Sequence, residues 1–251
     1  MFQIIALWSH PRSMSTATER IMRERGDLHC FHEPFMYYYY VQRQVRELPH
    51  FDIKDDHPTS YSDIRDMVLQ QAEHGPVFFK DMSYYVMPDA LEDETFMRRL
   101  THCFLIRNPV ASIASYYKLD PDLTCDEIGL DAQWAHFCGL RDMGLNPVVI
   151  EAEAIRDDAE SSIGELWRAI GLPYKARAFD WQTAPPKDWQ QVSNWHGDVS
   201  SSNAIRPISD SEIADQKSRF ETLCVQAPHL AKYLDHHRPF YENLRAQASG
   251  G

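Results

Sequence analysis

The chain has 251 residues, of which 43% are hydrophobic and 25% are charged, an ordinary composition for a globular protein. A chain of this length can bury a sizeable core without disulfides or a structural metal. We predict one domain over residues 1–246 and a disordered tail at 247–251. The formal net charge of −12 argues against a protein that binds nucleic acid or other polyanionic polymers, because both ligands need a basic surface.

The cysteines and the apolar segments bear on the compartment. The five cysteines show neither a CxxC motif nor a Cys/His pairing at zinc-ligand spacing, so we expect reduced thiols in a reducing compartment and no metal. The apolar run at residues 4–8 is too short for a signal peptide. No stretch of about 18 apolar residues could cross a bilayer. These features predict a cytoplasmic protein without a membrane partner.

Hydrophobic patterning predicts alternating strands and helices in the first half of the chain. A strand over Phe2–Trp8, apolar almost throughout as expected for burial on both faces, leads through a polar turn into a helix over Ser15–Glu24. The next expected elements are a strand at Leu28–His32, a helix at Val41–Arg46, a helix from Ser60 or Ser62 to about His74, a strand at Val77–Lys80, a short helix closing at Phe96–Leu100 and a strand at His102–Ile106.

The same alternation continues in the second half. The expected elements are a helix from Asn108-Pro109 through Tyr117, a long helix over Cys125–Met143, a strand at Pro147–Glu151, a helix over Ser161–Ile170, an irregular segment at 179–208, and a final helical region that is capped by Ser209 or Asp210, broken at Pro228 and ends near Arg245. This order predicts an α/β three-layer sandwich. Its central sheet is mostly parallel and flanked by helices, with a P-loop-like strand-turn-helix at the N-terminus.

Positively charged side chains follow or end three of the five predicted strands. Arg12 comes after the first strand, Lys80 ends the third, and Arg107 follows the fourth. In parallel α/β sheets the carboxyl ends of the strands meet at one edge, and ligands bind beyond that edge. We therefore expect the three cations to converge there, where they could bind a small anion in spite of the overall negative charge.

The first polar turn, Ser9-His10-Pro11-Arg12-Ser13-Met14-Ser15-Thr16, is the best candidate for an anion site. A strand-turn-helix presents backbone amides and the positive end of a helix to an anion. The turn contains no glycine and no lysine, so it does not match the GxxxxGK[ST] sequence of nucleotide triphosphatases. Magnesium-dependent hydrolysis of ATP or GTP is disfavoured for this reason.

This turn resembles the phosphosulfate loop of sulfotransferases that use 3′-phosphoadenosine 5′-phosphosulfate, in which a Pro-(Lys/Arg)-Ser turn lies between the first strand and the first helix. The resemblance implies that Arg12 stabilises the bridging oxygen as sulfate departs, and that Ser13, Ser15 and Thr16 hold the 5′-phosphate. Met14, also in the cofactor-binding turn, stands where many members of the family have glycine.

A second motif strengthens the resemblance. Leu105-Ile106-Arg107-Asn108-Pro109 and the helix after it are similar to the family's 3′-phosphate element, in which an arginine follows a strand and a serine lies eight residues further on. Eight residues are just over two helical turns, so Ser115 faces roughly the same side as the start of the helix. Arg107 can make bidentate contacts with a phosphate. Taken alone, this segment also fits an ordinary strand-to-helix turn.

The catalytic base is assigned by the same resemblance. Many family members have Lys-Thr-His at the end of the third strand, with histidine as the base, but here the stretch is Lys80-Asp81-Met82. Lys80 would help to neutralise the transferring sulfate, whereas methionine cannot accept a proton. His32-Glu33-Pro34-Phe35 is similar to branches of the family in which glutamate is the base, so Glu33 is the first candidate. His32 and Asp81 are the alternatives.

The leading hypothesis is therefore transfer of a sulfuryl group from 3′-phosphoadenosine 5′-phosphosulfate to a small acceptor that bears a hydroxyl or amine, with no metal required. The alternatives are a noncatalytic nucleotide-binding protein of the same fold and a small-molecule kinase. The aromatic run Tyr37–Tyr40 is expected to form a wall of the acceptor pocket. A third phosphate contact could come from residues 195–203, which also fit a simple surface loop. The sequence does not define the oligomeric state.

Overall fold

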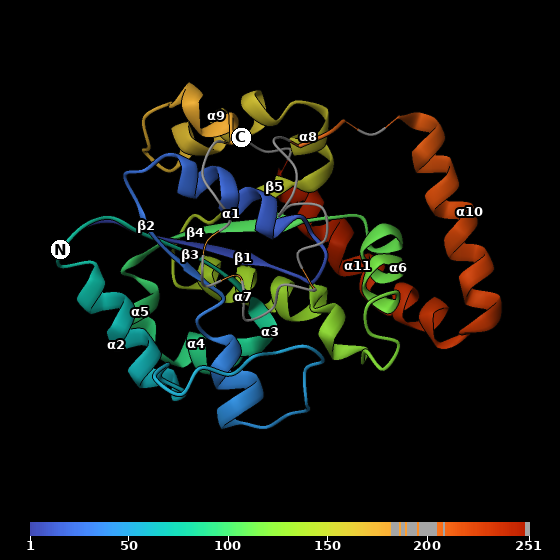
Figure 1. The fold of residues 1–251 in the computed structure, drawn as a ribbon, viewed down its shortest axis with the longest axis horizontal. Coiled ribbons are helices and arrows are strands. Elements are labelled where there is room, and N and C mark those ends of the chain that lie inside the picture. Colours follow the sequence, from blue (N-terminus) through green and yellow to red (C-terminus); the bar gives the residue numbers. More distant parts are fainter. Residues whose placement is uncertain (182–185, 187–188, 190–194, 196–204, 208, 249–251) are drawn as a thin grey trace.

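Five parallel strands form the centre of the molecule in the computed structural model, in the order β2-β3-β1-β4-β5 (Figure 1). The structure describes residues 1–181, 186, 189, 195, 205–207 and 209–248. The strands are β1 (Ile4–Ser9), β2 (His29–His32), β3 (Val77–Met82), β4 (Leu100–Ile106) and β5 (Val148–Glu151). The predicted α/β class is confirmed, and all pairings in this sheet are parallel.

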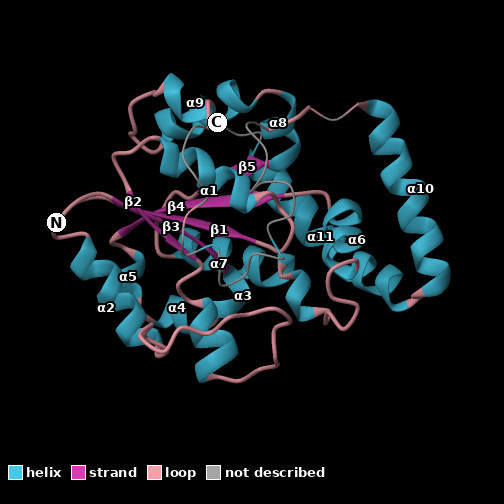
Figure 2. Cartoon of the chain, viewed as in Figure 1, coloured by secondary structure: helices cyan, strands magenta, loops and turns pink. Residues whose placement is uncertain are grey.

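Helices cover both faces of the sheet, which makes three layers (Figure 2). The α-helices are α1 (Ser15–Glu24), α2 (Tyr61–Gln71), α3 (Ser83–Val86), α4 (Asp89–Glu92), α5 (Glu94–Met97), α6 (Pro109–Tyr117), α7 (Leu130–Asp142), α8 (Ala152–Asp157), α9 (Ala159–Ala169), α10 (Asp210–Gln226) and α11 (His229–Ala248). A π-helix η1 (Tyr38–Gln42) and the 3-10 helices η2 (Asp126–Ile128) and η3 (Ala176–Phe179) complete the described elements. None of the described helices combines the length and the apolar character that a bilayer span needs.

The apolar sequence of β1 is explained by its central position. Successive side chains of a strand point to opposite faces of the sheet. Accordingly, Ile4, Ala6 and Trp8 belong to one buried cluster, while Ile5 and Leu7 belong to the cluster on the other face. Because both faces are covered, every side chain of β1 is buried and no polar alternation is needed.

The strand register brings the expected binding residues to one edge. Ser9, the last residue of β1, pairs with Met82 at the end of β3, and His32 at the end of β2 pairs with Lys80. β1 is flanked by β3 on one side and β4 on the other, so the chain moves in opposite directions from the centre of the sheet. This reversal beside β1 is the place where α/β sheets open a crevice for ligands.

Several element boundaries differ from those predicted. β3 runs two residues further than expected, through Asp81 and Met82, and the short helix before β4 ends at Met97 rather than at Leu100, which is the first residue of β4. The helix predicted at Val41–Arg46 is replaced by η1, which begins and ends earlier. The break at Pro228 is confirmed. α11 extends to Ala248, and residues 249–251 lie outside the described part of the chain.

The long helix predicted over Cys125–Met143 is wrong, and one glycine explains why. Gly129 has a φ of +75° and separates η2 from α7. This left-handed conformation carries little penalty in glycine and interrupts a right-handed helix. An added Cβ at Gly129 would lie 2.7 Å from Cδ1 of Tyr84, so the position also permits close packing against α3.

We predict that Gly129→Ala lowers the free energy of unfolding by about 2–4 kcal/mol, because backbone strain adds to the collision with Tyr84. Gly144→Ala is the matched control, since Gly144 has a φ of +78° but nothing within 4 Å of an added Cβ. The control should lose only about 1 kcal/mol. Equal losses of both variants in urea unfolding would show that the contact with Tyr84 is unimportant.

Candidate active site

The β1–α1 turn leaves backbone amides available at the start of α1. Met14, the residue before the helix, has a φ of 71° and makes no side-chain capping hydrogen bond. Arg12 also has a left-handed φ, of 62°. The first turn of α1 contains no acidic side chain, so nothing on the helix itself balances its positive N-terminal end. An anion at this turn could accept hydrogen bonds from the free N–H groups.

The structure brings the two phosphate-binding motifs expected from the sequence into direct contact. Nε of Arg12 donates a hydrogen bond to Oγ of Ser115 at 3.0 Å. Nη1 of Arg107 donates to the carbonyl oxygen of Arg12 at 2.7 Å. Arg12 also donates to the carbonyl oxygen of Trp195. The turn after β1 and the segment from β4 into α6 thus form one cationic unit, although they are about 100 residues apart in the chain.

Two arginine side chains are desolvated in this unit without a counter-ion. Burial lowers the pKa of Arg12. Burial also lowers the pKa of Arg107 to about 10, in spite of the opposing charge of Glu153. Among the described residues no carboxylate lies within ion-pair distance of either guanidinium. Buried charge without a partner is unfavourable, so both arginines would be stabilised by a bound anion.

Two buried polar atoms beside the arginines have no hydrogen-bond partner among the described residues. These atoms are Oγ of Ser13 and Nδ1 of His10. Nε2 of His10 accepts a hydrogen bond from the backbone N–H of Arg107 at 3.0 Å, so in the neutral ring the proton is on Nδ1. Both unpartnered atoms can therefore donate. Buried donors without a partner are rare in folded proteins and mark positions where a ligand or water is expected.

Lys80 and Glu33 form the second half of the site; Lys80 lies two residues before the end of β3, and Glu33 directly follows β2. Nζ of Lys80 makes an ion pair with Oε1 of Glu33 and lies 3.5 Å from Oγ of Ser15 in the β1–α1 turn. Burial by itself raises the pKa of Glu33, but the charge of Lys80 and its hydrogen bond outweigh burial and lower the net pKa below its ordinary value. Glu33 is therefore ionised at neutral pH and can accept a proton.

Aromatic side chains border the glutamate. The hydroxyl of Tyr85 donates to Oε2 of Glu33 at 3.4 Å. The ring of Tyr85 packs against Tyr40 and Tyr84, with centroids 5.5 Å and 4.7 Å away. These three tyrosines are buried. Tyr40 comes from the aromatic run that the sequence suggested as a pocket wall, and the structure brings that run to the side of Glu33.

The two alternative bases already have other partners. The carboxylate of Asp81 accepts hydrogen bonds from the backbone N–H groups of Phe35 at 2.8 Å and Met82 at 3.1 Å, and its side chain is fully buried. Nδ1 of His32 lies 2.6 Å from Oε2 of Glu19, inside the protein. Asp81 thus supports the backbone after β2, and His32 anchors α1 to β2. Glu33 is the candidate base whose contacts are with the site itself.

The structure also shows participants that sequence patterns did not identify. His10 joins the end of β1 to Arg107, and Tyr85 contacts Glu33 from a short helix that was not predicted. Glu19 accepts a hydrogen bond from Nε1 of Trp189 at 2.8 Å, which ties the late segment to α1. The third phosphate contact that the sequence suggested, at residues 195–203, lies outside the described residues except for Trp195.

The geometry defines an α/β protein with a strand-turn-helix whose N–H groups could receive an anion, a second arginine element and an adjacent Lys–Glu pair. A family model described as "Sulfotransferase domain" matches residues 2–207, and the chain belongs to this family. Family membership supports a transferase that acts on sulfuryl groups.

Two curated relatives and two solved structures are similar to this chain. Branched-chain-amino-acid aminotransferase-like proteins 2 and 1 of Arabidopsis thaliana are each 26% identical, over 77% and 81% of this chain. The chain spans only about a third of their length, at 34% and 36%. The fold is similar to the sulfotransferase domain from the Synechococcus PCC 7002 olefin synthase, with a TM-score of 0.54, 14% identity and coverage of 82% of this chain and 85% of that one. It is also similar to the sulfotransferase domain from the curacin biosynthetic pathway, with a TM-score of 0.50, 13% identity and coverage of 91% and 98%.

We predict that His10 makes the folded protein sensitive to acid. Burial, followed by the charge of Arg107, lowers the pKa of His10 from 6.5 to about 3. Between these values the unfolded chain binds more protons than the folded chain, so stability falls as pH falls below about 6.5. His10→Gln, which can still accept the Arg107 N–H, should lose about 2 kcal/mol less than the native chain between pH 7 and pH 5 in urea unfolding. Parallel losses in the two proteins would contradict a neutral, buried His10.

Proposed function

We propose that this chain transfers a sulfuryl group from 3′-phosphoadenosine 5′-phosphosulfate to a small acceptor that bears a hydroxyl or amine. Arg12, Ser13, Met14, Ser15 and Thr16 form the loop for the 5′-phosphosulfate. Arg107 and Ser115 bind the 3′-phosphate. Glu33, Lys80 and Arg12 take the catalytic roles.

The observation that carries the proposal is the pair of partly buried arginines that form no ion pair with a described residue, beside the Ser13 hydroxyl, which is likewise unpartnered among those residues. Two guanidinium groups supported by separate elements, one after β1 and one after β4, suit a ligand with two separate anionic groups. A nucleotide with phosphates at both the 5′ and the 3′ positions has this property. The negative charges of ATP lie on a single triphosphate group. The GK[ST] sequence that binds such a group is missing from the turn.

The cofactor supplies an activated sulfuryl group whose departure leaves negative charge on the 5′-phosphate. Arg12 and Lys80 flank the β1–α1 turn and balance that charge. Glu33, held ionised by Lys80, takes the proton of the acceptor's hydroxyl or amine. The new bond joins sulfur to the acceptor atom, and the bond between sulfur and the bridging oxygen breaks. Atoms and charge therefore balance without a metal.

The surroundings of Glu33 suit a small acceptor. Tyr85 donates a hydrogen bond to one oxygen of the carboxylate, and the buried rings of Tyr40 and Tyr84 pack against Tyr85. Aromatic rings near the base favour the apolar part of an acceptor, whose nucleophile would then face Glu33. A noncatalytic nucleotide-binding protein would not need a glutamate held in the ionised form at this position. The cytoplasmic location stays a prediction.

We predict that Glu33→Gln lowers the rate of sulfuryl transfer by about 10²–10⁴-fold, because the amide cannot take the acceptor's proton. Binding of adenosine 3′,5′-bisphosphate should remain within a few-fold of the native value, because the phosphates contact other residues. The rate is measured by product formation with a panel of phenols, alcohols and amines, and binding is measured by calorimetry.

Glu73→Gln is the matched control, since Glu73 is exposed on the surface. The control should keep full activity. If Glu33→Gln turned over normally, Glu33 would not be the base. If no acceptor in the panel were sulfated by the native chain although the bisphosphate bound, the noncatalytic alternative would be favoured instead.

We predict that Arg107→Met weakens binding of adenosine 3′,5′-bisphosphate by about 10–100-fold, the usual loss for a charge-assisted hydrogen bond. Adenosine 5′-phosphate lacks the 3′-phosphate, so its affinity should not change. Arg168→Met is the control, because Arg168 is exposed on α9. Equal weakening of both nucleotides would contradict the 3′-phosphate assignment, and a preference of the native chain for ATP would contradict the proposed cofactor.

A further inference from the structure

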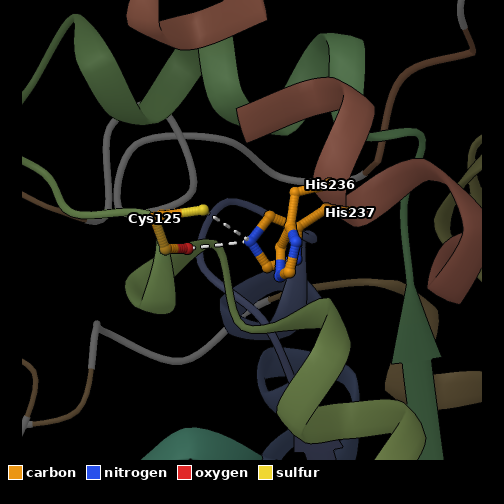
Figure 3. Close-up of side chains that lie close together, drawn as sticks. All are labelled: Cys125, His236 and His237. Carbon is orange, nitrogen blue, oxygen red and sulfur yellow. Dashed lines mark hydrogen bonds between the residues drawn. The ribbon is translucent and has the colours of Figure 1, made fainter. Parts of the chain in front are cut away.

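Cys125, His236 and His237 lie together at a place remote in sequence from the phosphate motifs. Cys125 precedes η2, and the two histidines are on α11, more than 100 residues later (Figure 3). One ligand atom from each residue lies within 4.8 Å of the others. A sulfur and two imidazole nitrogens are the donors that zinc prefers in proteins.

The distances suit a tetrahedral ion. Bonds of about 2.3 Å to sulfur and about 2.0–2.1 Å to nitrogen place tetrahedral ligand atoms about 3.3–3.6 Å apart. Sγ of Cys125 lies 3.6 Å from Nε2 of His237. The side chain of His236 is half exposed and can rotate through the remaining gap. The set therefore needs small side-chain movements rather than a rearrangement of α11.

Asp131, at the start of α7, completes the set. One oxygen of its carboxylate lies 3.2 Å from Nε2 of His236, and the other lies 3.8 Å from Nδ1 of His237. A carboxylate beside ligating histidines is the common outer partner in zinc sites. The same group could also serve as a fourth ligand, and either role increases affinity for a divalent cation.

An unpartnered buried atom points to the same conclusion. Nε2 of His237 donates to the carbonyl oxygen of Cys125 at 2.8 Å, which leaves Nδ1 without a proton in the neutral ring. Nδ1 is buried and has no hydrogen-bond partner among the residues that the structure describes, although it lies 3.8 Å from the carboxylate of Asp131. If Nε2 bound a metal instead, the ring proton would move to Nδ1 and could be donated to Asp131. Metal binding would thus satisfy an atom that is unsatisfied without it.

We infer that Cys125, His236 and His237 form a structural Zn²⁺ site, oriented by Asp131, that fastens α11 to the segment before α7. Binding converts the Cys125 thiol to a thiolate and releases one proton per metal ion. The site lies outside the residues assigned to sulfuryl transfer, so it does not depend on the proposed function and supplies no step of it.

The experiment uses the full chain without a histidine tag, stripped with chelator and then titrated with Zn²⁺ by calorimetry. We expect one ion per chain. At a hundredfold excess over the dissociation constant, the thermal midpoint should rise by about 5–10 °C. Cobalt(II) should give a thiolate-to-metal absorption band, which reports directly on the Cys125 ligand.

Three variants test the ligands. Asp131→Asn should weaken zinc binding by about 10–100-fold, and Cys125→Ser by more than that, with loss of the cobalt thiolate band. His236→Ala tests a further ligand. Because this side chain is half exposed, its removal should not impair folding.

Matched controls remove a cysteine or a histidine from the neighbouring helices. Cys138→Ser on α7 and His229→Ala, about two turns before His236 on α11, should bind zinc as the native chain does. Failure of the native chain to bind a stoichiometric ion would overturn the inference. Unchanged affinity in both Cys125→Ser and His236→Ala would also overturn it.

Discussion

Positive charge that is partly buried beside the carboxyl ends of β1 and β4, without an ion-pair partner among the described residues, is the constraint on which the rest of the site depends. Arg12 and Arg107 are held there by short turns whose ends are fixed by central strands. Desolvation lowers the pKa of both guanidinium groups because it disfavours their charged form. A bound anion would offset this free-energy cost. A chain with a net charge of −12 can therefore bind a polyanionic nucleotide, because affinity is set by local charge.

The opposite side of the turn is organised by charge balance. Lys80 is buried and forms an ion pair with Glu33, so the two charges balance each other when no ligand is bound. The pairing keeps the glutamate ionised and close to the turn, which is the state a general base requires. One half of the site thus holds charge for binding, and the other half holds a proton acceptor for chemistry.

Backbone strain is concentrated at the same place. Five non-glycine residues in the described part of the chain have a positive φ, and three of them are Arg12, Met14 and Glu33. Left-handed conformations cost about 1–2 kcal/mol in residues with a Cβ. Such strain persists where the surrounding structure fixes the backbone, and it is common in functional sites. Met14 therefore occupies a conformation that glycine adopts freely, which accounts for the family's frequent use of glycine there.

The sequence by itself determined the α/β class, the parallel arrangement and the positions of Arg12 and Arg107 beyond the ends of β1 and β4. It placed Lys80 correctly in β3 but ended that strand two residues too early. These features depend on local periodicity and on the rule that parallel strands end at a common edge. The helix predicted over Cys125–Met143 failed because Gly129 has a left-handed φ, at a position where an added Cβ would collide with Tyr84. The sequence shows where a glycine is, but not which φ it adopts.

Only the tertiary structure decided which side chains meet. The contact of Arg12 with Ser115, the bond from Arg107 to His10 and the approach of Cys125 to α11 each join segments about 100 residues apart. The spacing rules that exclude a zinc site detect ligands close together in the chain, and they cannot detect a set assembled by packing. Local patterns fix elements and their ends, whereas the geometry of a site depends on the packing of distant elements.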